Sequence, residues 1–192
     1  MKVSRSIFLL STLFVIFFSV TTAVAQSRDY MTDAEIEIVR DAQDIDTRID
    51  VLTKMIDRRF AVLKVDVGGA RIPAKETEKW GPPPEGSRMQ ILDDIRKLLD
   101  KAIDDIDDTA THPNKYVIDP DKPDKVKKTD EARFPSSVKN LAASAKSYQP
   151  ALRSLLDKTT DDKEKGLILA AIDSCDEIIA ASTKLPAATK TN

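Results

Sequence analysis

The segment from Ile91 to Ile106 reads ILDDIRKLLDKAIDDI, and its pattern decides the fold class. Its apolar residues recur at alternating intervals of three and four, which is typical of one face of an α-helix. These positions are Leu92, Ile95, Leu99, Ala102 and Ile106, flanked by Ile91, Leu98 and Ile103. Just upstream, Ser87 and Gln90 have the spacing of a capping box, in which two side chains satisfy free amides at the start of a helix. We therefore predict a helix over residues 88–110.

Residues 33–64 show the same kind of pattern over a longer stretch. They follow a capping box formed by Thr32 and Glu35, and only Arg59 interrupts their apolar face. The apolar positions are Ile38, Ala42, Ile45, Ile49, Leu52, Ile56 and Leu63. This heptad-like spacing suits a bundle or a coiled coil and predicts one continuous helix of about 50 Å.

Two further helices are predicted towards the C-terminus. The third covers residues 136–158, and Pro135 is of the type favoured in a first turn. Pro150 falls inside its apolar pattern, which predicts a kink near residues 145–146 or, alternatively, two shorter helices. Asp161 and Glu164 have the spacing of a third capping box, which opens the fourth helix at 162–184.

Four amphipathic helices bury their apolar faces most simply in a four-helix bundle, so we predict an all-α domain over residues 32–185 with two long loops. A short lead at 26–31 precedes this domain, and a flexible tail at 186–192 follows it. In the first loop, residues 65–86, Gly68 and Gly69 should stop the preceding helix and Trp80 should dock on the bundle. The second loop, residues 111–130, is polar except for Tyr116-Val117-Ile118, which we expect to attach it to the bundle.

The N-terminal residues 1–25 have the form of a signal peptide, which we expect to be a helix before it is removed. Basic Lys2 and Arg5 precede the apolar stretch Ile7–Val20, and Ala23-Val24-Ala25 offers a cleavage site before Gln26. We therefore expect a periplasmic or secreted protein with no membrane span after cleavage. The alternative is an uncleaved anchor over residues 7–25, which is close to the length that crosses a bilayer.

Composition and motifs exclude several functions. The formal net charge is −2, and removal of Lys2 and Arg5 makes it more negative, which argues against nucleic-acid binding. The sequence has one histidine, His112, and one cysteine, Cys175, which lies on an apolar helix face and is expected to be buried. It lacks the Cys-x-x-Cys-His, paired Glu-x-x-His, His-Glu-x-x-His, Gly-x-Ser-x-Gly and glycine-rich phosphate-loop motifs. We therefore predict no catalytic residue, no cofactor and no enzyme.

The acidic end of the 88–110 helix holds the only candidates for a metal site. Asp104, Asp108 and His112 are spaced by four residues and would share a face if the helix reached His112. Pro113 makes a helical conformation at His112 unfavourable. We therefore favour a solvent-facing stripe without metal, since the aspartates between Asp93 and Asp108 should lie largely outside the apolar face.

These features predict a non-enzymatic, secreted or periplasmic helical-bundle protein that acts as a binding, scaffold or envelope-complex component. Its partner would be an envelope protein or a second copy of the chain, contacted through helical faces. The alternative is a divalent-cation or small-ligand binding protein that uses the acidic end of the 88–110 helix and the loop after it.

Overall fold

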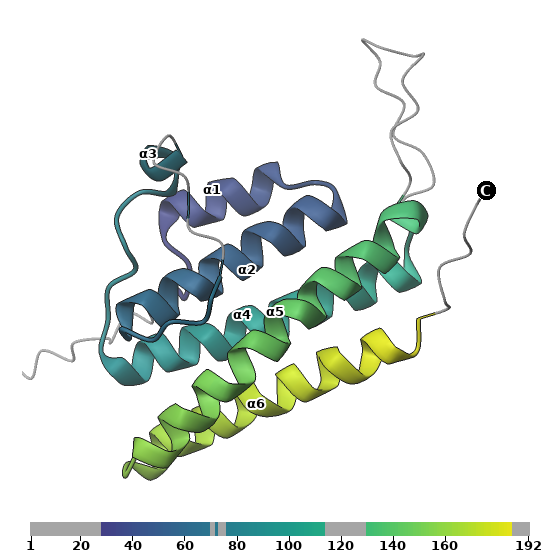
Figure 1. Ribbon diagram of the computed structural model, residues 1–192. Helices are drawn as coiled ribbons and strands as arrows, with labels where there is room; N and C mark the ends of the chain where they lie inside the picture. The colour runs from purple at the N-terminus through teal and green to yellow at the C-terminus, as the bar shows by residue number, and fades with distance from the viewer. Residues whose placement is uncertain (1–27, 70–71, 73–75, 114–129, 186–192) are drawn as a thin grey trace, which may run out of the picture.

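The structure, a computed structural model, describes residues 28–69, 72, 76–113 and 130–185. Over these ranges the chain forms six α-helices and no strand, so the predicted all-α class is confirmed (Figure 1). The helices are α1 (Asp33–Asp41), α2 (Ile45–Val62), α3 (Thr77–Trp80), α4 (Arg88–Thr111), α5 (Asp130–Lys158) and α6 (Asp162–Thr183). The segments predicted to be a signal peptide with its cleavage site, a loop attachment at Tyr116-Val117-Ile118 and a tail from 186 lie outside the described residues.

The predicted continuous helix over 33–64 is wrong, because the chain turns between α1 and α2. Ala42 leaves the helical conformation with a ψ of 80°, and its carbonyl accepts a hydrogen bond from Arg48 Nε at 2.9 Å. Asp44 is extended and pairs with Arg133 of α5. The turn lets α1 fold back along α2 (Figure 1), so Ile38 is buried within this chain and needs no partner molecule. At about 27 Å, the 18-residue α2 is roughly half the predicted length.

One apolar core joins the four longest helices. α5 packs on α6 and α2, and α4 packs on α6 and α2, whereas α1 contacts only α2 and α3 among the described helices. Leu52, Met55, Leu99, Leu152 and Ile168 are among its fully buried members. Each lies on the predicted apolar face of its helix or next to it. Residues that recur with the 3.6-residue period of an α-helix lie on one side of it, and that side packs away from water.

Two single residues with expected structural roles are buried in this core. Trp80, at the end of α3, is 4% exposed, so its predicted docking is confirmed. Cys175 of α6 is fully buried, and burial raises the pKa of its thiol to about 12. A thiol with this pKa is almost wholly protonated at neutral pH and is a poor nucleophile.

The helix ends follow the predicted capping chemistry at most positions. The Thr32–Glu35 and Ser87–Gln90 capping boxes both form, and they begin α1 and α4. Asp161 caps α6 by accepting from the amides of Lys163 and Glu164. The Glu164 carboxylate instead accepts from Arg88 Nε of α4 at 3.0 Å, so the third pair ties two helices together.

Helix α5 begins earlier than predicted and is unbroken. It starts at Asp130 and contains both Pro135 and Pro150, so Pro135 is not in its first turn and the alternative of two shorter helices is wrong. Phe134, before the predicted start, packs against the core, and Tyr148 and Leu152 are buried on either side of Pro150. Burial of this continuous apolar face outweighs the cost of a proline in a helix interior, which is about 3 kcal/mol.

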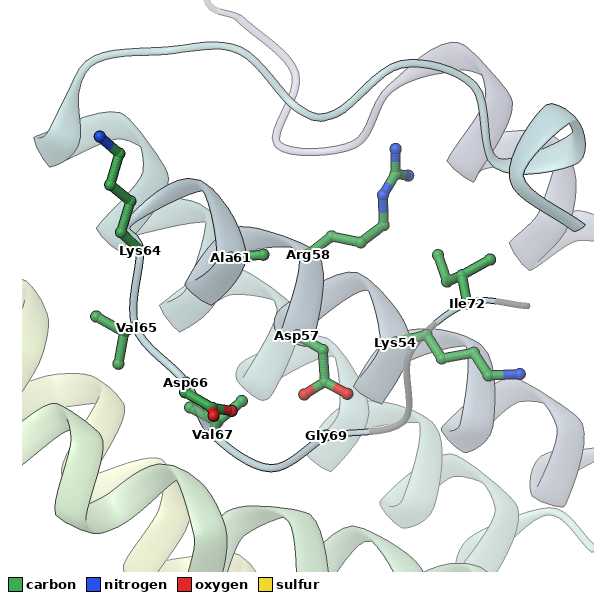
Figure 2. Close-up of a pocket in the computed structure, with 10 residues that line it drawn as sticks. All are labelled: Lys54, Asp57, Arg58, Ala61, Lys64, Val65, Asp66, Val67, Gly69 and Ile72. Carbon is green, nitrogen blue, oxygen red and sulfur yellow. The ribbon is translucent and has the colours of Figure 1, made fainter. Parts of the chain in front are cut away.

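The end of α2 is set by Lys64 and not by the glycines that follow it. Lys64 has a φ of 59°, a left-handed conformation that is costly for a residue with a Cβ atom. The amide of Val65 donates to the carbonyl of Phe60 at 2.9 Å, which closes a Schellman-type turn. The chain then runs back beside α2 from Val65 to Gly69 (Figure 2). Within the described ranges, no helix is both long and apolar enough to cross a membrane.

Candidate binding site

A pocket of about 470 Å³ opens on the outer face of α2, which we call the α2 pocket (Figure 2). Helix α2 contributes Lys54, Asp57, Arg58 and Ala61 to it. The segment that turns back from the helix end contributes Lys64, Val65, Asp66, Val67, Gly69 and Ile72. Figure 2 shows Ala61 at the centre, with the chain that follows Lys64 curving around it. The pocket therefore exists because the chain reverses at Lys64.

A second hollow of about 390 Å³ lies between α2 and α5 and shares Lys54, Asp57 and Gly69 with the α2 pocket. Its α5 wall is polar and consists of Asn140, Ala143, Ser144, Ser147 and Tyr148. The α2 pocket has more aliphatic lining. The two hollows therefore give one face of α2 an apolar compartment next to a polar one.

Asp57 lies at the boundary of the two hollows. Tyr148 Oη lies 2.9 Å from Asp57 Oδ1 and 3.2 Å from the Thr53 carbonyl, so the phenol has two acceptors within reach. Burial raises the pKa of the Asp57 carboxyl, and the hydrogen bond from Tyr148 offsets part of that rise. Gly69 crosses so close to Asp57 that a Cβ atom there would lie 2.1 Å from Oδ2. Only glycine fits at residue 69 unless this carboxylate moves.

Behind the pocket lies a charge cluster in which Glu35, Arg59 and Asp94 are buried and Arg28 and Arg58 are partly exposed. Arg59 and Glu35 are both fully buried and form a bidentate pair in which Nη1 and Nη2 donate to the two carboxylate oxygens. Arg59 Nη2 also donates to the carbonyl of Tyr30 at 2.6 Å. Arg59, which interrupts the apolar face of α2, therefore holds Tyr30 and α1 against that helix.

Arg58 connects this cluster to the α2 pocket, which it also lines. Its Nη1 donates to Glu35 at 2.7 Å, and its Nη2 donates to the carbonyls of Gly81 and Pro82. The guanidinium carbon lies 5.5 Å from the ring centroid of Trp80, within range of a cation–π interaction. Burial lowers the pKa of Arg58, and the Glu35 charge opposes that effect. One side chain thus contacts α1, the chain after α3 and the pocket.

The cluster contains three guanidinium groups and two carboxylates. Asp94 accepts from Arg28 at 2.6 Å, and its other oxygen lies 3.7 Å from Arg59 Nε. Within the part of the chain that the structure describes, neither Asp94 Oδ2 nor Arg59 Nε has a hydrogen-bond partner. Burial raises the pKa of Asp94 despite the two nearby arginines. With both carboxylates ionised, the cluster retains one positive charge among the described residues.

The residues suggested as metal ligands lie at the other end of α4. His112 Nδ1 is 3.1 Å from Asp108 Oδ1, and both side chains are highly exposed. They line a polar hollow of about 240 Å³ with Arg48 and Asp105, but Asp104 does not. Asp105 is paired with Lys101 at 2.6 Å, and Arg48 lies 3.8 Å away. Where the chain is described, no group of three or more His, Cys, Asp or Glu residues could hold a metal ion.

The sequence predicted the helix that carries the α2 pocket but not the residues that matter in it. Asp94 and Asp105 are buried, whereas the other five aspartates between Asp93 and Asp108 are not, so the expectation that these residues lie largely outside the apolar face holds except at two positions. Arg59 was visible only as a break in the apolar pattern and Glu35 only as part of a helix cap, and nothing in the pattern singled out Arg58. Their partners lie 23 or more positions away, beyond the reach of periodicity.

No family model matches the chain, and no curated protein or solved structure matches it either. Its function must therefore be inferred from the residues of the site.

Proposed function

We propose that this chain is a non-enzymatic binding or scaffold protein of the cell envelope, secreted or periplasmic, built on a four-helix bundle of α2, α4, α5 and α6. The observation that carries the proposal is the pair of adjoining hollows on one face of α2, which share Lys54, Asp57 and Gly69. The α2 pocket is within the size range of small-ligand sites, roughly 300–1,000 Å³. A partner's side chain or a small molecule would occupy it.

Binding fits the side chains of these hollows better than catalysis does. Asp57 is held by Tyr148, and Lys54 is paired with Asp50 at 2.8 Å. Cys175 is buried and protonated, and His112 lies in a different hollow, so neither offers a nucleophile or a base to this face. A carboxyl group with a raised pKa in a cleft is common at functional sites, and it marks Asp57 as a contact for the bound group.

Site-directed photo-crosslinking in the native host tests the proposal. A photoreactive amino acid at Asp66, which is exposed at the pocket, should form a covalent adduct with a partner protein, a small molecule or a second copy of the chain. The matched control places the same amino acid at Asp173, an exposed position on α6. An absence of adducts at Asp66, or equal adducts at both positions, contradicts the proposal.

The proposed periplasmic or secreted location is tested by the mass of the mature protein. Intact mass of the protein from the soluble envelope fraction should correspond to a chain that begins at Gln26. A full-length mass in the membrane fraction would instead make residues 7–25 an anchor.

A further inference from the structure

We propose that the two adjoining hollows on α2 bind an alkylammonium group, with its charged head in the hollow between α2 and α5 and its carbon chain in the α2 pocket. We call the first of these the α2–α5 hollow. The two spaces meet at Lys54, Asp57 and Gly69, which line both of them. This inference rests on the proposed binding function and names the chemical class of the ligand.

Asp57 supplies the unbalanced charge of the α2–α5 hollow. Among the described residues, the charged side chains that line this hollow are Asp50, Lys54 and Asp57. Lys54 Nζ is paired with Asp50 at 2.8 Å, so these two charges cancel. Asp57 Oδ1 accepts from the phenol of Tyr148, a neutral donor that leaves the carboxylate charge in place. With Asp57 ionised, the lining therefore favours a cation.

The charges of the α2 pocket are separated in space. Figure 2 shows the carboxylates of Asp57 and Asp66 on the side where the chain curves towards Gly69. Three cationic side chains extend away from that side: Lys54, Arg58 and Lys64. Two of them are already ion-paired, with Asp50 and Glu35, whereas Asp66 accepts from a backbone amide. The side of the pocket that adjoins the α2–α5 hollow is therefore acidic.

The α2–α5 hollow also provides acceptors for an ammonium group, which has three N–H donors and no acceptor. Asp57 Oδ2 accepts no hydrogen bond from the described residues, since the phenol of Tyr148 uses Oδ1. Neutral side chains with an oxygen atom line the same space: Thr53, Asn140, Ser144 and Ser147. Burial raises the pKa of the Asp57 carboxyl, and a bound cation would offset this loss of hydration.

The α2 pocket offers an aliphatic surface for the carbon chain. Val65, Val67 and Ile72 are half-buried along the returning chain, and Ala61 lies exposed on the helix beneath them. A long aliphatic cation gains most when its chain covers apolar surface and its charged end stays in polar surroundings. The adjoining compartments provide this arrangement.

Hexylammonium and hexanoate, which have similar chains and opposite charges, test the charge preference. Hexylammonium titrated into the purified protein should give saturable heat in calorimetry. It should also shift the amide NMR signals of Gly68 and Gly69, which line the α2–α5 hollow. Hexanoate should bind more weakly or not at all. Equal or stronger binding of hexanoate overturns the inference, as does the absence of hexylammonium binding.

Two variants locate the head and the chain of the ligand. Asp57→Asn keeps the shape of the side chain but removes its charge, and it should weaken hexylammonium binding about tenfold. Asp173→Asn, the same change at an exposed position of α6, should leave binding unchanged. Ala61→Phe fills the α2 pocket and should remove the gain in affinity from propylammonium to hexylammonium. Unchanged binding in Asp57→Asn, or equal losses in Asp57→Asn and Asp173→Asn, overturns the inference.

Arg71 tests whether the chain supplies the cation itself. It follows Gly69 by two positions in the sequence and lies outside the described residues. Hexylammonium binding to Arg71→Gln but not to the wild type would assign the acidic side of the pocket to this arginine and overturn the inference.

Failure of this inference can be told apart from failure of the proposed function. If hexylammonium does not bind but the photoreactive group at Asp66 still captures a component, the binding function stands and the ligand class is wrong. If Asp66 captures nothing beyond the Asp173 control and hexylammonium does not bind, both are wrong. Where both experiments succeed, the mass of the Asp66 adduct distinguishes a free amine from the lysine side chain of a partner protein.

Discussion

Glu35 of α1 and Arg59 of α2 are a bidentate ion pair in which neither side chain is exposed to solvent. The carboxylate also accepts from the amide of Thr32 at 3.0 Å and from Arg58, so one residue caps α1 and fastens it to α2. A buried pair of this kind is expensive to break, because removal of one partner leaves the other charged and unsolvated.

Glu35→Gln should therefore lower the free energy of unfolding by about 3–5 kcal/mol, as should Arg59→Met. The double variant should lose less than the sum of the two single losses, because each single change strands its partner. Urea unfolding of the three variants measures this coupling. Glu37→Gln, which removes the exposed pair of Glu37 with Arg40, is the control and should cost less than about 0.5 kcal/mol. Additive losses in the double variant would show that the two residues act independently.

Lys64→Gly should stabilise the fold by about 1 kcal/mol. Glycine adopts the φ of 59° found at residue 64 without a steric penalty, whereas lysine does not. Lys64→Ala keeps the Cβ atom and so should not show this gain, which separates the backbone effect from the loss of charge. Thermal melts of both variants suffice, and equal stabilities for glycine and alanine would rule out strain at this turn.

The same substitution should have opposite effects at two glycines. Gly81 has a φ of 63° and a ψ of −170°, a region that only glycine occupies readily, and an added Cβ would lie 3.1 Å from that of Ala34. Gly81→Ala should destabilise the fold by about 1–3 kcal/mol and loosen Trp80, which its fluorescence would reveal. Gly166→Ala, in open space within α6, should stabilise it by about 0.5–1 kcal/mol. Similar shifts in the two melting temperatures would show that the backbone conformation of Gly81 does not require glycine.

Asp57→Asn should change how stability depends on pH. The folded protein holds the Asp57 proton more tightly than the unfolded chain, whose pKa is near the ordinary 3.8. The contribution of Asp57 is therefore greatest below pH 3.8 and is lost as the pH rises through the raised pKa of the folded state. Asparagine still accepts from Tyr148 but does not titrate. Between pH 3.8 and the raised pKa of folded Asp57, the wild type should therefore lose stability that Asp57→Asn keeps.

Tyr148→Phe provides the companion measurement for Asp57. The hydrogen bond from Tyr148 lowers the pKa of Asp57, so its removal should raise that pKa further and move the pH window upwards. Urea unfolding at several pH values, or NMR titration of the Asp57 carboxyl, measures both effects. A window that does not move in Tyr148→Phe would show that the phenol has no electrostatic effect on Asp57.

The sequence predicts the parts of this fold that depend on neighbouring residues, such as helix caps and apolar periodicity within one helix. Helices α4 and α6 end within one residue of the predicted bounds, because capping and periodicity agree there. The turn at Ala42 was hidden, since Ile38, Ala42 and Ile45 keep their helical spacing across it. The Gln43-Asp44 pair was the only hint, because aspartate favours the position before a helix.

The α2 pocket was harder to predict than the helices. Its shape depends on a lysine in a left-handed conformation and on a chain reversal that brings Gly69 onto Asp57. Its charge depends on arginines whose partners come from α1, from α4 and from the chain after α3. None of these relationships is periodic, so no spacing rule could have identified them.

The contact between Arg28 and Asp94 spans 66 positions, and this has a consequence for the order in which the chain folds. If the protein is threaded across a membrane from its N-terminus, residues 28–41 emerge first, but their buried partners on α2 and α4 follow much later. Helix α1 can pair with Arg59 as soon as α2 has emerged, but we expect Arg28 to stay unpaired until Asp94 has followed. Asp94→Ala should accordingly leave the chain around Arg28 more open to proteolysis than it is in the wild type.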